Sequence, residues 1–240
     1  MIDWLRPELA DPIVEIAGEP VPIAIRRHAR ATRLTMRLAP DGSEVRITMP
    51  RWGRTAEAIA FAQSRQDWLE RQLRALPSQT PPLPEGTIFF RGEELTIDWE
   101  ERHPRRPVRD GNSIRIGGPV QGLEGRLRRW LEREAQTLME TDLAHYCTRA
   151  DKPSPVLRLS RAQRRWGSCG TDGTIRINWR LVQAPDHVRR SVVAHEVAHL
   201  VHFDHSPAFH DLLDRLFEGD ISVANAWLKA NGRSLYTTFS

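Results

Sequence analysis

Residues 191–210 read SVVAHEVAHLVHFDHSPAFH, and the H-E-x-x-H pattern inside this stretch decides the fold and the chemistry that we expect. Apolar residues recur at helical spacing around it, and neither proline nor glycine interrupts them. On a helix, His195 and His199 lie one turn apart on the same face, so both imidazoles can reach one metal ion. Glu196 is turned by about 100° from His195 and can reach a water on that metal. This arrangement is typical of zinc-dependent hydrolysis, in which a carboxylate takes a proton from the water.

A catalytic zinc ion generally has three protein ligands and one open position. If the helix continues, the Cα of His202 lies about 10 Å further along the axis than that of His195, too far to share an ion. His205 directly precedes the next predicted helix, where a turn can fold its imidazole back over the metal. We therefore favour His205, and Glu218 on the following helix is the main alternative. The full set of candidates for the third ligand is His202, Asp204, His205, His210, Asp211, Asp214 and Glu218.

A second pattern lies upstream, where residues 164–170 read RRWGSCG. Gly167 permits a tight or left-handed backbone. We expect a turn and a strand packed beside the predicted helix that carries His195 and His199. Trp166 is a candidate for the floor of a substrate cleft. Arg165 is a candidate for stabilising an oxyanion or binding a substrate carboxylate or phosphate, and the alternative is a solvated charge. Cys169 is interpreted as a small packed residue rather than a metal ligand or reactive thiol.

Residues 195–213, HEVAHLVHFDHSPAFHDLL, resemble the signature of the YgjP-like metallopeptidases, which are related to the SprT-like and WSS1-like zinc proteases. After the H-E-x-x-H motif, that signature continues with a histidine, a serine or glycine and an aromatic residue, here His205, Ser206 and Phe209. The segments RRWGSCG, IRINWRL at 175–181 and RRHARATRLTMRLAPDG at 26–42 also resemble this family. The resemblance therefore covers nearly the whole chain and is most specific over 156–217.

The resemblance implies a zincin-like metallopeptidase domain with an H-E-x-x-H active-site helix. It implies one zinc ion (Zn²⁺) bound by His195, His199 and His205, with Glu196 as the catalytic acid and base. The expected function is hydrolysis of peptide bonds by a zinc-activated water, and the expected partner is a protein or peptide substrate.

Two other functions remain open. One is a metal-dependent hydrolase of nucleotides or phosphate esters, although the sequence has no glycine-rich phosphate loop and no carboxylate-rich two-metal cluster. The other is a nucleic-acid-associated protease, based on arginine clusters at 26–30, 105–109, 126–129 and 161–165. These clusters are dispersed and few aromatic residues lie between them, so nucleic acid is the more weakly supported partner.

The composition is that of a folded chain. The protein has 240 residues, of which 40% are hydrophobic and 28% charged, with a formal net charge of +4. Only two cysteines are present, which is typical of a reducing compartment. No apolar run reaches the roughly 18 residues of a membrane helix, and the N-terminus has no apolar signal core. We therefore expect a cytoplasmic protein and no membrane partner.

The predicted fold class is α+β, because strands are followed by helices. An N-terminal β-rich region with helices is expected over 1–85, ending in a proline-rich linker at 77–86. A β-region and a long helix are expected over 86–150, and the metallopeptidase domain over 151–240. The predicted strands lie at 21–27, 34–38, 44–49, 87–90, 94–99, 113–116, 156–160 and 174–179, and the predicted helices at 55–76, 119–149, from 186, 206–217 and 222–230.

The strand predicted at 174–179 alternates, with Ile175 and Ile177 on one face and Arg176 and Asn178 on the other. Such alternation is typical of a half-buried strand. We expect this strand to border the active-site cleft with an exposed edge, which would give main-chain hydrogen bonds to an extended substrate. The alternative is a central strand that is paired on both sides.

Overall fold

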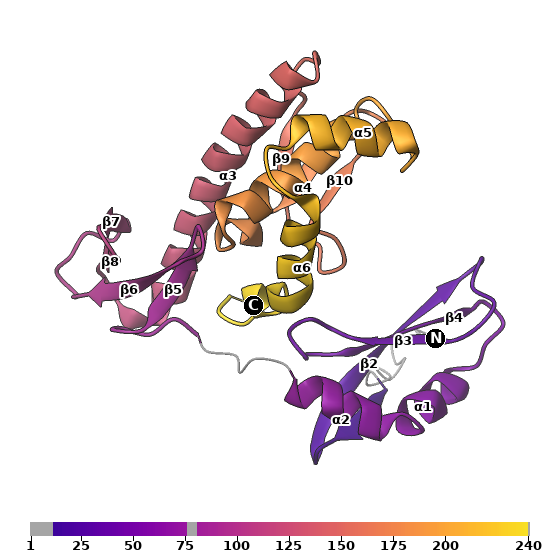
Figure 1. Cartoon of the computed structure of the whole chain (residues 1–240). Coiled ribbons are helices and arrows are strands. Elements are labelled where there is room, and N and C mark those ends of the chain that lie inside the picture. The colour runs from indigo at the N-terminus through magenta and orange to yellow at the C-terminus, as the bar shows by residue number, and fades with distance from the viewer. Residues whose placement is uncertain (1–11, 76–80, 240) are drawn as a thin grey trace, which may run out of the picture. The chain divides into compact units, whose positions relative to one another are not determined.

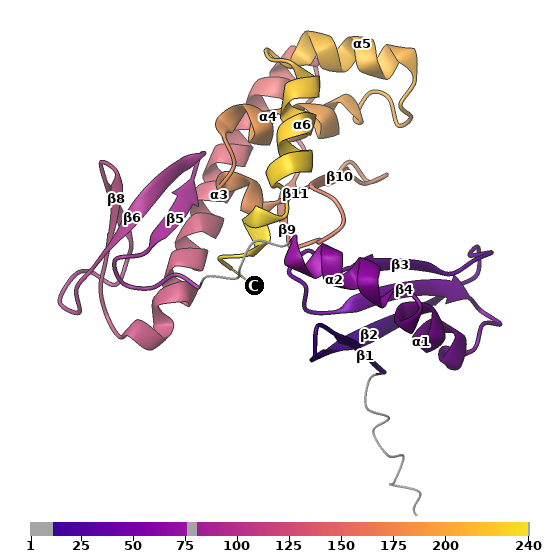
Figure 2. The ribbon, with the colours of Figure 1, turned by 60° about the horizontal axis from the view of Figure 1, so that its bottom comes forward.

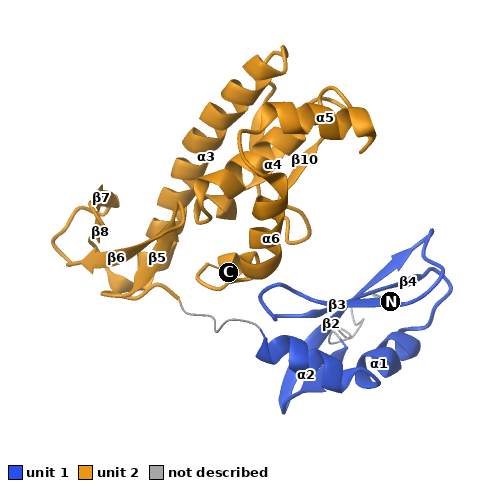
Figure 3. Ribbon diagram, in the orientation of Figure 1, with its two compact units in different colours: residues 1–78 blue, residues 79–240 orange. Residues whose placement is uncertain are grey.

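The computed structural model describes residues 12–75 and 81–239 (Figure 1). The chain divides into two compact units, Met1–Ser78 and Gln79–Ser240 (Figure 3). The division lies within the proline-rich linker predicted at 77–86, whose first residues fall outside the described ones. Residues 1–11, on which the expectation that the N-terminus has no signal core depends, also lie outside the described residues. The finer division into 1–85, 86–150 and 151–240 stays a prediction.

The first unit is a four-stranded sheet with helices packed against it (Figure 2). Its strand order is β1-β2-β4-β3, in which β2 and β4 run parallel and the other neighbours run antiparallel. Alternate residues of β4 point into the core, and Val45, Ile47 and Met49 are fully buried. The strands are β1 Ile13–Ile16, β2 Glu19–His28, β3 Thr35–Leu38 and β4 Val45–Pro50.

The single helix predicted at 55–76 is wrong, because the structure has two helices there. These are α1 Thr55–Gln63 and α2 Gln66–Arg74. At the break, the Ser64 hydroxyl donates to the Phe61 carbonyl at 2.9 Å. A serine side chain that bonds to the nearby backbone competes with helical hydrogen bonds. Of the apolar residues at helical spacing, Ala62 and Leu69 are buried, and Ile59 and Leu73 pack against the same core. The pattern therefore predicted burial but not the break.

The second unit begins with another four-stranded sheet, of order β5-β6-β8-β7. The predicted strands at 87–90, 94–99 and 113–116 are confirmed to within one residue, and the short β7 was not predicted. The long helix predicted at 119–149 is confirmed as α3, preceded by one turn of 3-10 helix at Val120–Gly122. The elements are β5 Thr87–Phe90, β6 Glu93–Trp99, β7 Val108–Asp110, β8 Ser113–Ile116 and α3 Leu123–Arg149.

The rest of the second unit is a three-stranded sheet and three helices that pack with α3 (Figure 1). The sheet order is β10-β11-β9, with β9 parallel and β10 antiparallel to β11. A 3-10 helix at Trp179–Val182 joins β11 to the helix that carries the H-E-x-x-H motif. The elements are β9 Leu157–Ser160, β10 Gly167–Cys169, β11 Ile175–Asn178, α4 Asp186–Ala198, α5 Pro207–Leu216 and α6 Ile221–Asn231.

One hydrophobic core runs through the second unit. Leu127 and Leu131 of α3 belong to the same buried cluster as Ile97 of β6, Ile177 of β11 and Val193 of α4. Each such side chain contributes about 1.5–3 kcal/mol when it is fully buried, so α3 holds both sheets and α4 in one body. Although α3 has 27 residues, no helix of the described chain has the length and apolar content needed to cross a membrane.

The predicted open edge of the strand at 174–179 is wrong. Strand β11 pairs with β10 through Ile177 and Gly167, and with β9 through Ile177 and Leu159. Both of its edges are therefore occupied by neighbouring strands. Alternation of apolar and polar residues indicates which face of a strand is buried, but it carries no information about the edges.

Candidate metal centre and substrate cleft

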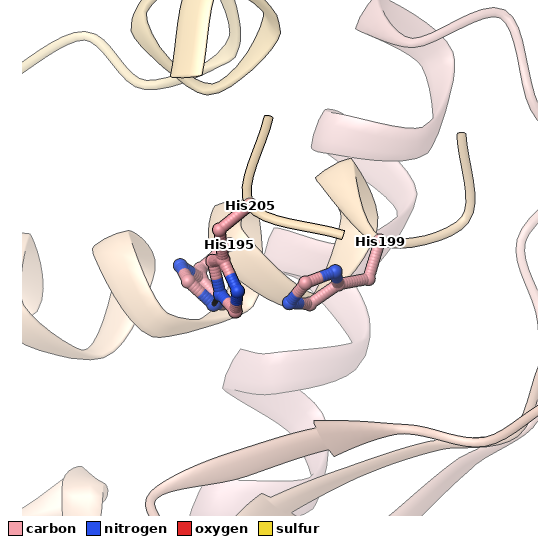
Figure 4. A group of neighbouring side chains, drawn as sticks. All are labelled: His195, His199 and His205. Carbon is pink, nitrogen blue, oxygen red and sulfur yellow. Dashed lines mark hydrogen bonds between the residues drawn. The ribbon is translucent and has the colours of Figure 1, made fainter. Parts of the chain in front are cut away.

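Three imidazoles meet at the end of α4 (Figure 4). One nitrogen from each of His195, His199 and His205 lies within 4.8 Å of the other two. The Nε2 atoms of His195 and His205 are 3.4 Å apart. Two nitrogen ligands at about 2.0–2.1 Å from a tetrahedral zinc ion are separated by about 3.4 Å. The spacing of these donors, with no carboxylate between them, suits a zinc ion.

The local backbone explains this convergence. His195 lies in the last turn of α4, which ends at Ala198, so that His199 is already its C-terminal cap. The chain then turns and enters α5, whose N-terminal cap is Ser206 with Pro207 at the first helical position. Proline is favoured at the first helical position because the backbone N–H there has no partner within the helix, and proline lacks that N–H. The start of α5 therefore holds His205 over His195 and His199 at the C-terminal end of α4.

Phe209, on the first turn of α5, forms the floor beneath the three imidazoles. It is fully buried, and its ring centroid lies 5.0, 4.6 and 4.9 Å from those of His195, His199 and His205. Burial, together with the neighbouring His199 and His205, lowers the pKa of His195 to about 4. The imidazole is therefore neutral near pH 7 and keeps a lone pair for a metal.

His199 is oriented by the backbone that follows it. Its Nδ1 lies 3.0 Å from the carbonyl oxygen of His202. Because a carbonyl only accepts hydrogen bonds, Nδ1 must be the donor, which leaves the lone pair on Nε2. Such a partner fixes the tautomer and ring orientation of a metal-binding histidine. His202 thus lies beside the cluster and acts there through its main chain.

Glu196 lies against strand β10, where Gly167 approaches its carboxylate, and it lines the same pocket as His195. Its side chain is buried, and burial raises its pKa to about 7, against opposing effects of the Cys169 N–H and the Arg165 charge. Its Oε2 is buried and has no hydrogen-bond partner among the described residues. A buried acceptor without a partner is rare in proteins, so this oxygen is available to a substrate or a water.

Gly167 of β10 makes room for this carboxylate. A Cβ at this position would lie 2.4 Å from Oε1 of Glu196, closer than any real contact. The sequence predicted a glycine needed for its backbone freedom, whereas the structure shows one needed for the close approach of Glu196. The sequence carries no signal that separates the two roles.

A pocket of about 210 Å³ opens beside His195 and Glu196. Trp166 and Gly167 form one wall, and α6 forms the opposite wall with residues that the sequence did not single out. Trp166 is held by packing on Tyr236, with ring centroids 5.6 Å apart. The lining residues are Trp166, Gly167, Ser191, Val192, His195, Glu196, Ile221, Asn225 and Leu228. Arg165 does not line the pocket; it is exposed and acts on Glu196 through its charge.

The rival ligand Glu218 lies in a different cluster. Its carboxylate accepts hydrogen bonds from Tyr146 at 2.8 Å and from Arg190 at 2.8 Å, and its Oε1 lies 2.7 Å from Nε2 of His145. Of the candidates for a third ligand, the group of potential metal-binding residues around His195 contains His205 alone. His210 lies next to this group, with its ring centroid 6.4 Å from that of His205.

The start of α4 is anchored by buried charge. Nε of Arg189 donates to Oδ2 of Asp142 on α3 at 2.8 Å, and both side chains are 3% exposed. Asp186, in the first turn of α4, pairs with Arg91 of the loop after β5. A carboxylate in the first turn also interacts favourably with the helix dipole. These contacts fix α4 on α3 and so fix the histidines at its other end.

Comparison with known proteins gives the family of the chain. A sequence model described as "YgjP-like, metallopeptidase domain" matches residues 32–231. The match defines the protein as a metallopeptidase by class. The chain belongs to the YgjP-like metallopeptidase family. The resemblance stated from the sequence is thereby confirmed.

Two further comparisons add no information about the function. No curated protein matches the chain. A solved structure, the metallopeptidase zymogen of Pyrococcus abyssi abylysin, is 16% identical and gives a TM-score of 0.34. The similarity covers 44% of this chain and 99% of that one.

Proposed function

We propose that this protein is a zinc-dependent peptidase in which His195, His199 and His205 hold one Zn²⁺. The observation that carries the proposal is the meeting of three imidazole nitrogens within 4.8 Å, beside a buried carboxylate. Membership of a metallopeptidase family supports a peptide substrate. Bound here, zinc would supply a Lewis acid that polarises a carbonyl group and lowers the pKa of water.

Glu196 is the proposed general base and acid. Its protein surroundings alone raise its pKa to about 7, and a catalytic base works best when its pKa lies near the working pH. Oε2, which has no described partner, would take the proton of the attacking water. The same oxygen would then pass the proton to the leaving nitrogen of the cleaved peptide bond.

We propose that the substrate backbone binds to the edge of β10 that has no paired strand among the described residues. Strand β10 pairs with β11 on one side, and it carries Gly167, which lines the pocket next to Glu196. A peptide that adds to this edge would gain main-chain hydrogen bonds without strong sequence preference. One side chain of the substrate would enter the pocket, where Ile221 and Leu228 favour a small apolar group.

The alternative chemistry, hydrolysis of phosphate esters, has less support. The lining of the pocket beside Glu196 contains no arginine or lysine among the described residues. A phosphate substrate generally needs such cations for recognition. Arg165, exposed and outside the lining, is the nearest candidate that the sequence offered.

A cleavage assay tests the proposal. The zinc-loaded protein should hydrolyse casein, a chelator should abolish the activity, and added zinc should restore it. Nucleoside triphosphates and phosphate monoesters should not be hydrolysed. Hydrolysis of these phosphates, with casein left intact under the same conditions, would contradict the peptidase assignment.

A further inference from the structure

An arginine-rich groove lies at the N-terminal end of α3, beside the loop that leads into β7. Its volume is about 1130 Å³, and it shares no lining residue with the pocket beside Glu196. The sequence clusters at 105–109 and 126–129 looked dispersed, and the fold brings them together here. The lining residues are Arg105, Arg106, Pro107, Pro119, Gln121, Gly122, Glu124, Gly125, Arg126, Arg128, Arg129 and Arg133.

Most of the positive charge of this groove has no acidic partner among the described residues. Arg105, Arg106, Arg126, Arg129 and Arg133 form no ion pair with any described carboxylate, and Glu124 is the groove's own acidic residue. Other arginines of the same unit do have acidic partners. Such pairs are Arg91–Asp186, Arg109–Glu93, Arg115–Asp98, Arg161–Glu132 and Arg189–Asp142.

Arg126, in the groove, is also held in place by the backbone. Nη2 of Arg126 donates to the Pro119 carbonyl at 2.7 Å, and its Nε is buried without a hydrogen-bond partner among the described residues. Gly122 leaves space for this guanidinium, because a Cβ there would lie 2.7 Å from Nη1. Burial lowers the pKa of Arg126, and the charges of Arg105 and Arg129 lower it further. A bound anion would relieve this repulsion.

We propose that this groove binds the phosphate backbone of double-stranded nucleic acid. Guanidinium groups match phosphate oxygens in a bidentate manner. Arg126, Arg129 and Arg133 follow one another at intervals of three and four residues, so they form a row of about 10 Å along one face of α3. A row of that length faces several phosphates of a duplex, which carries one charge per about 1.7 Å of axis.

The lining favours a phosphate backbone over the other candidates. No aromatic side chain lines the described groove, so it offers no platform for stacking the bases of a single strand. It also lacks the apolar or aromatic anchors that dominate protein–protein interfaces. The opening is larger than a single phosphate needs, which favours an extended chain of phosphates over a small anion.

Binding of the full chain to a fluorescent 20-base-pair DNA duplex, followed by anisotropy over a salt series, tests the proposal. Because about five arginines contribute, log K should fall with log salt at a slope of about −4. The variant R105E/R129E/R133E changes exposed side chains and leaves Arg126 in place. It should reduce the slope by about 3 and the affinity by at least about 100-fold.

The matched control is R26E/R30E/R33E, which makes the same change in net charge on exposed residues of the first unit. It should lower affinity less than threefold, and all proteins should keep the same unfolding temperature and metal content. An equal loss in the control would overturn the proposal, because binding would then follow net charge. Equally tight binding of a poly-glutamate peptide would assign the groove to acidic proteins instead. Full competition by inorganic tripolyphosphate at the same phosphate concentration would assign it to small anions.

Discussion

The cluster around His195 and the cluster around Glu218 each contain a glutamate and at least one histidine, but in opposite electrostatic settings. Glu196 is 5% exposed, and burial raises its pKa to about 7. Partial burial would also raise the pKa of Glu218. Hydrogen bonds from Tyr146 and His145 and the charge of Arg190 outweigh that effect and lower its pKa to about 2.

The difference shows how one helix supports two roles. Glu196 belongs to α4, and Glu218 contacts α4 through Arg190. Because Glu218 has several donors and a cation, it stays ionised and ties α4 to α3 and to the end of α5. Glu196 has the Cys169 N–H and one oxygen without a described partner. A carboxylate that lacks donors is held near its protonation midpoint, as general acid–base chemistry requires. The Glu218 cluster stabilises the fold, and the His195 cluster is arranged to react.

The largest effect should come from Glu196→Gln. The substitution keeps the shape of the side chain but removes the base, so turnover on casein should fall by about 10²–10⁴-fold. Zinc content and unfolding temperature should stay at their wild-type values. The matched control is Glu218→Gln, which should keep wild-type turnover. A Glu196→Gln enzyme with full activity would remove this residue from the mechanism.

The second largest effect should be on zinc affinity, which distinguishes the His195 cluster from the Glu218 cluster. His205→Ala should weaken zinc binding by more than the about 10–100-fold that loss of an outer-shell partner causes, because it removes one of three ligands. Glu218→Ala should keep zinc, and so should His210→Ala, a nearby histidine outside the cluster. Metal titration against a fluorescent chelator measures all three affinities. Loss of zinc from the Glu218 variant alone would reverse the assignment.

Gly167→Ala should displace the Glu196 carboxylate, although Gly167 itself is not a catalytic residue. The added Cβ would lie 2.4 Å from Glu196 Oε1, so the carboxylate or β10 must shift, at a cost of about 1–3 kcal/mol. We expect lower turnover together with a lower unfolding temperature. Ser168→Ala, on the same strand, should change stability by less than about 0.5 kcal/mol. If the two variants behave alike, Gly167 does not position Glu196.

The smallest effect should be the acid dependence of the Glu218 cluster. Its pKa is lowered from 4.5 to about 2 on folding, so its contribution to stability is present above about pH 4.5 and is lost as the pH falls toward 2. The effect is modest because the side chain is 41% exposed. Urea unfolding at pH 5 and pH 3 should show Glu218→Gln less stable than wild type mainly at pH 5. A stability gap that does not change with pH would contradict this account.

The reactive cluster was predictable in the part that local spacing determines. His195 and His199 lie one helical turn apart, and the turn before Ser206 indicated that His205 could return to them. The role of Gly167, the floor formed by Phe209 and the pocket wall from α6 depend on packing between distant segments. No short pattern in the sequence encodes such packing.

The fold was predictable to a similar extent. Strands with clear alternation and turn signals, such as 87–90 and 113–116, match the structure. The position of β11 in its sheet was not predictable, because pairing on each edge is set by β9 and β10 elsewhere in the chain. The break at Ser64 was missed because the apolar pattern does not show that the serine hydroxyl donates to the Phe61 carbonyl of the backbone.

Zinc-edge anomalous diffraction from crystals of the zinc-loaded protein tests the central claim most directly. The account predicts one anomalous peak, about 2.0–2.1 Å from one nitrogen each of His195, His199 and His205. The Glu196 carboxylate should lie outside direct coordination, within reach of the open position. A peak coordinated by Glu218, or a zinc ion bound by fewer than two of these histidines, would contradict it.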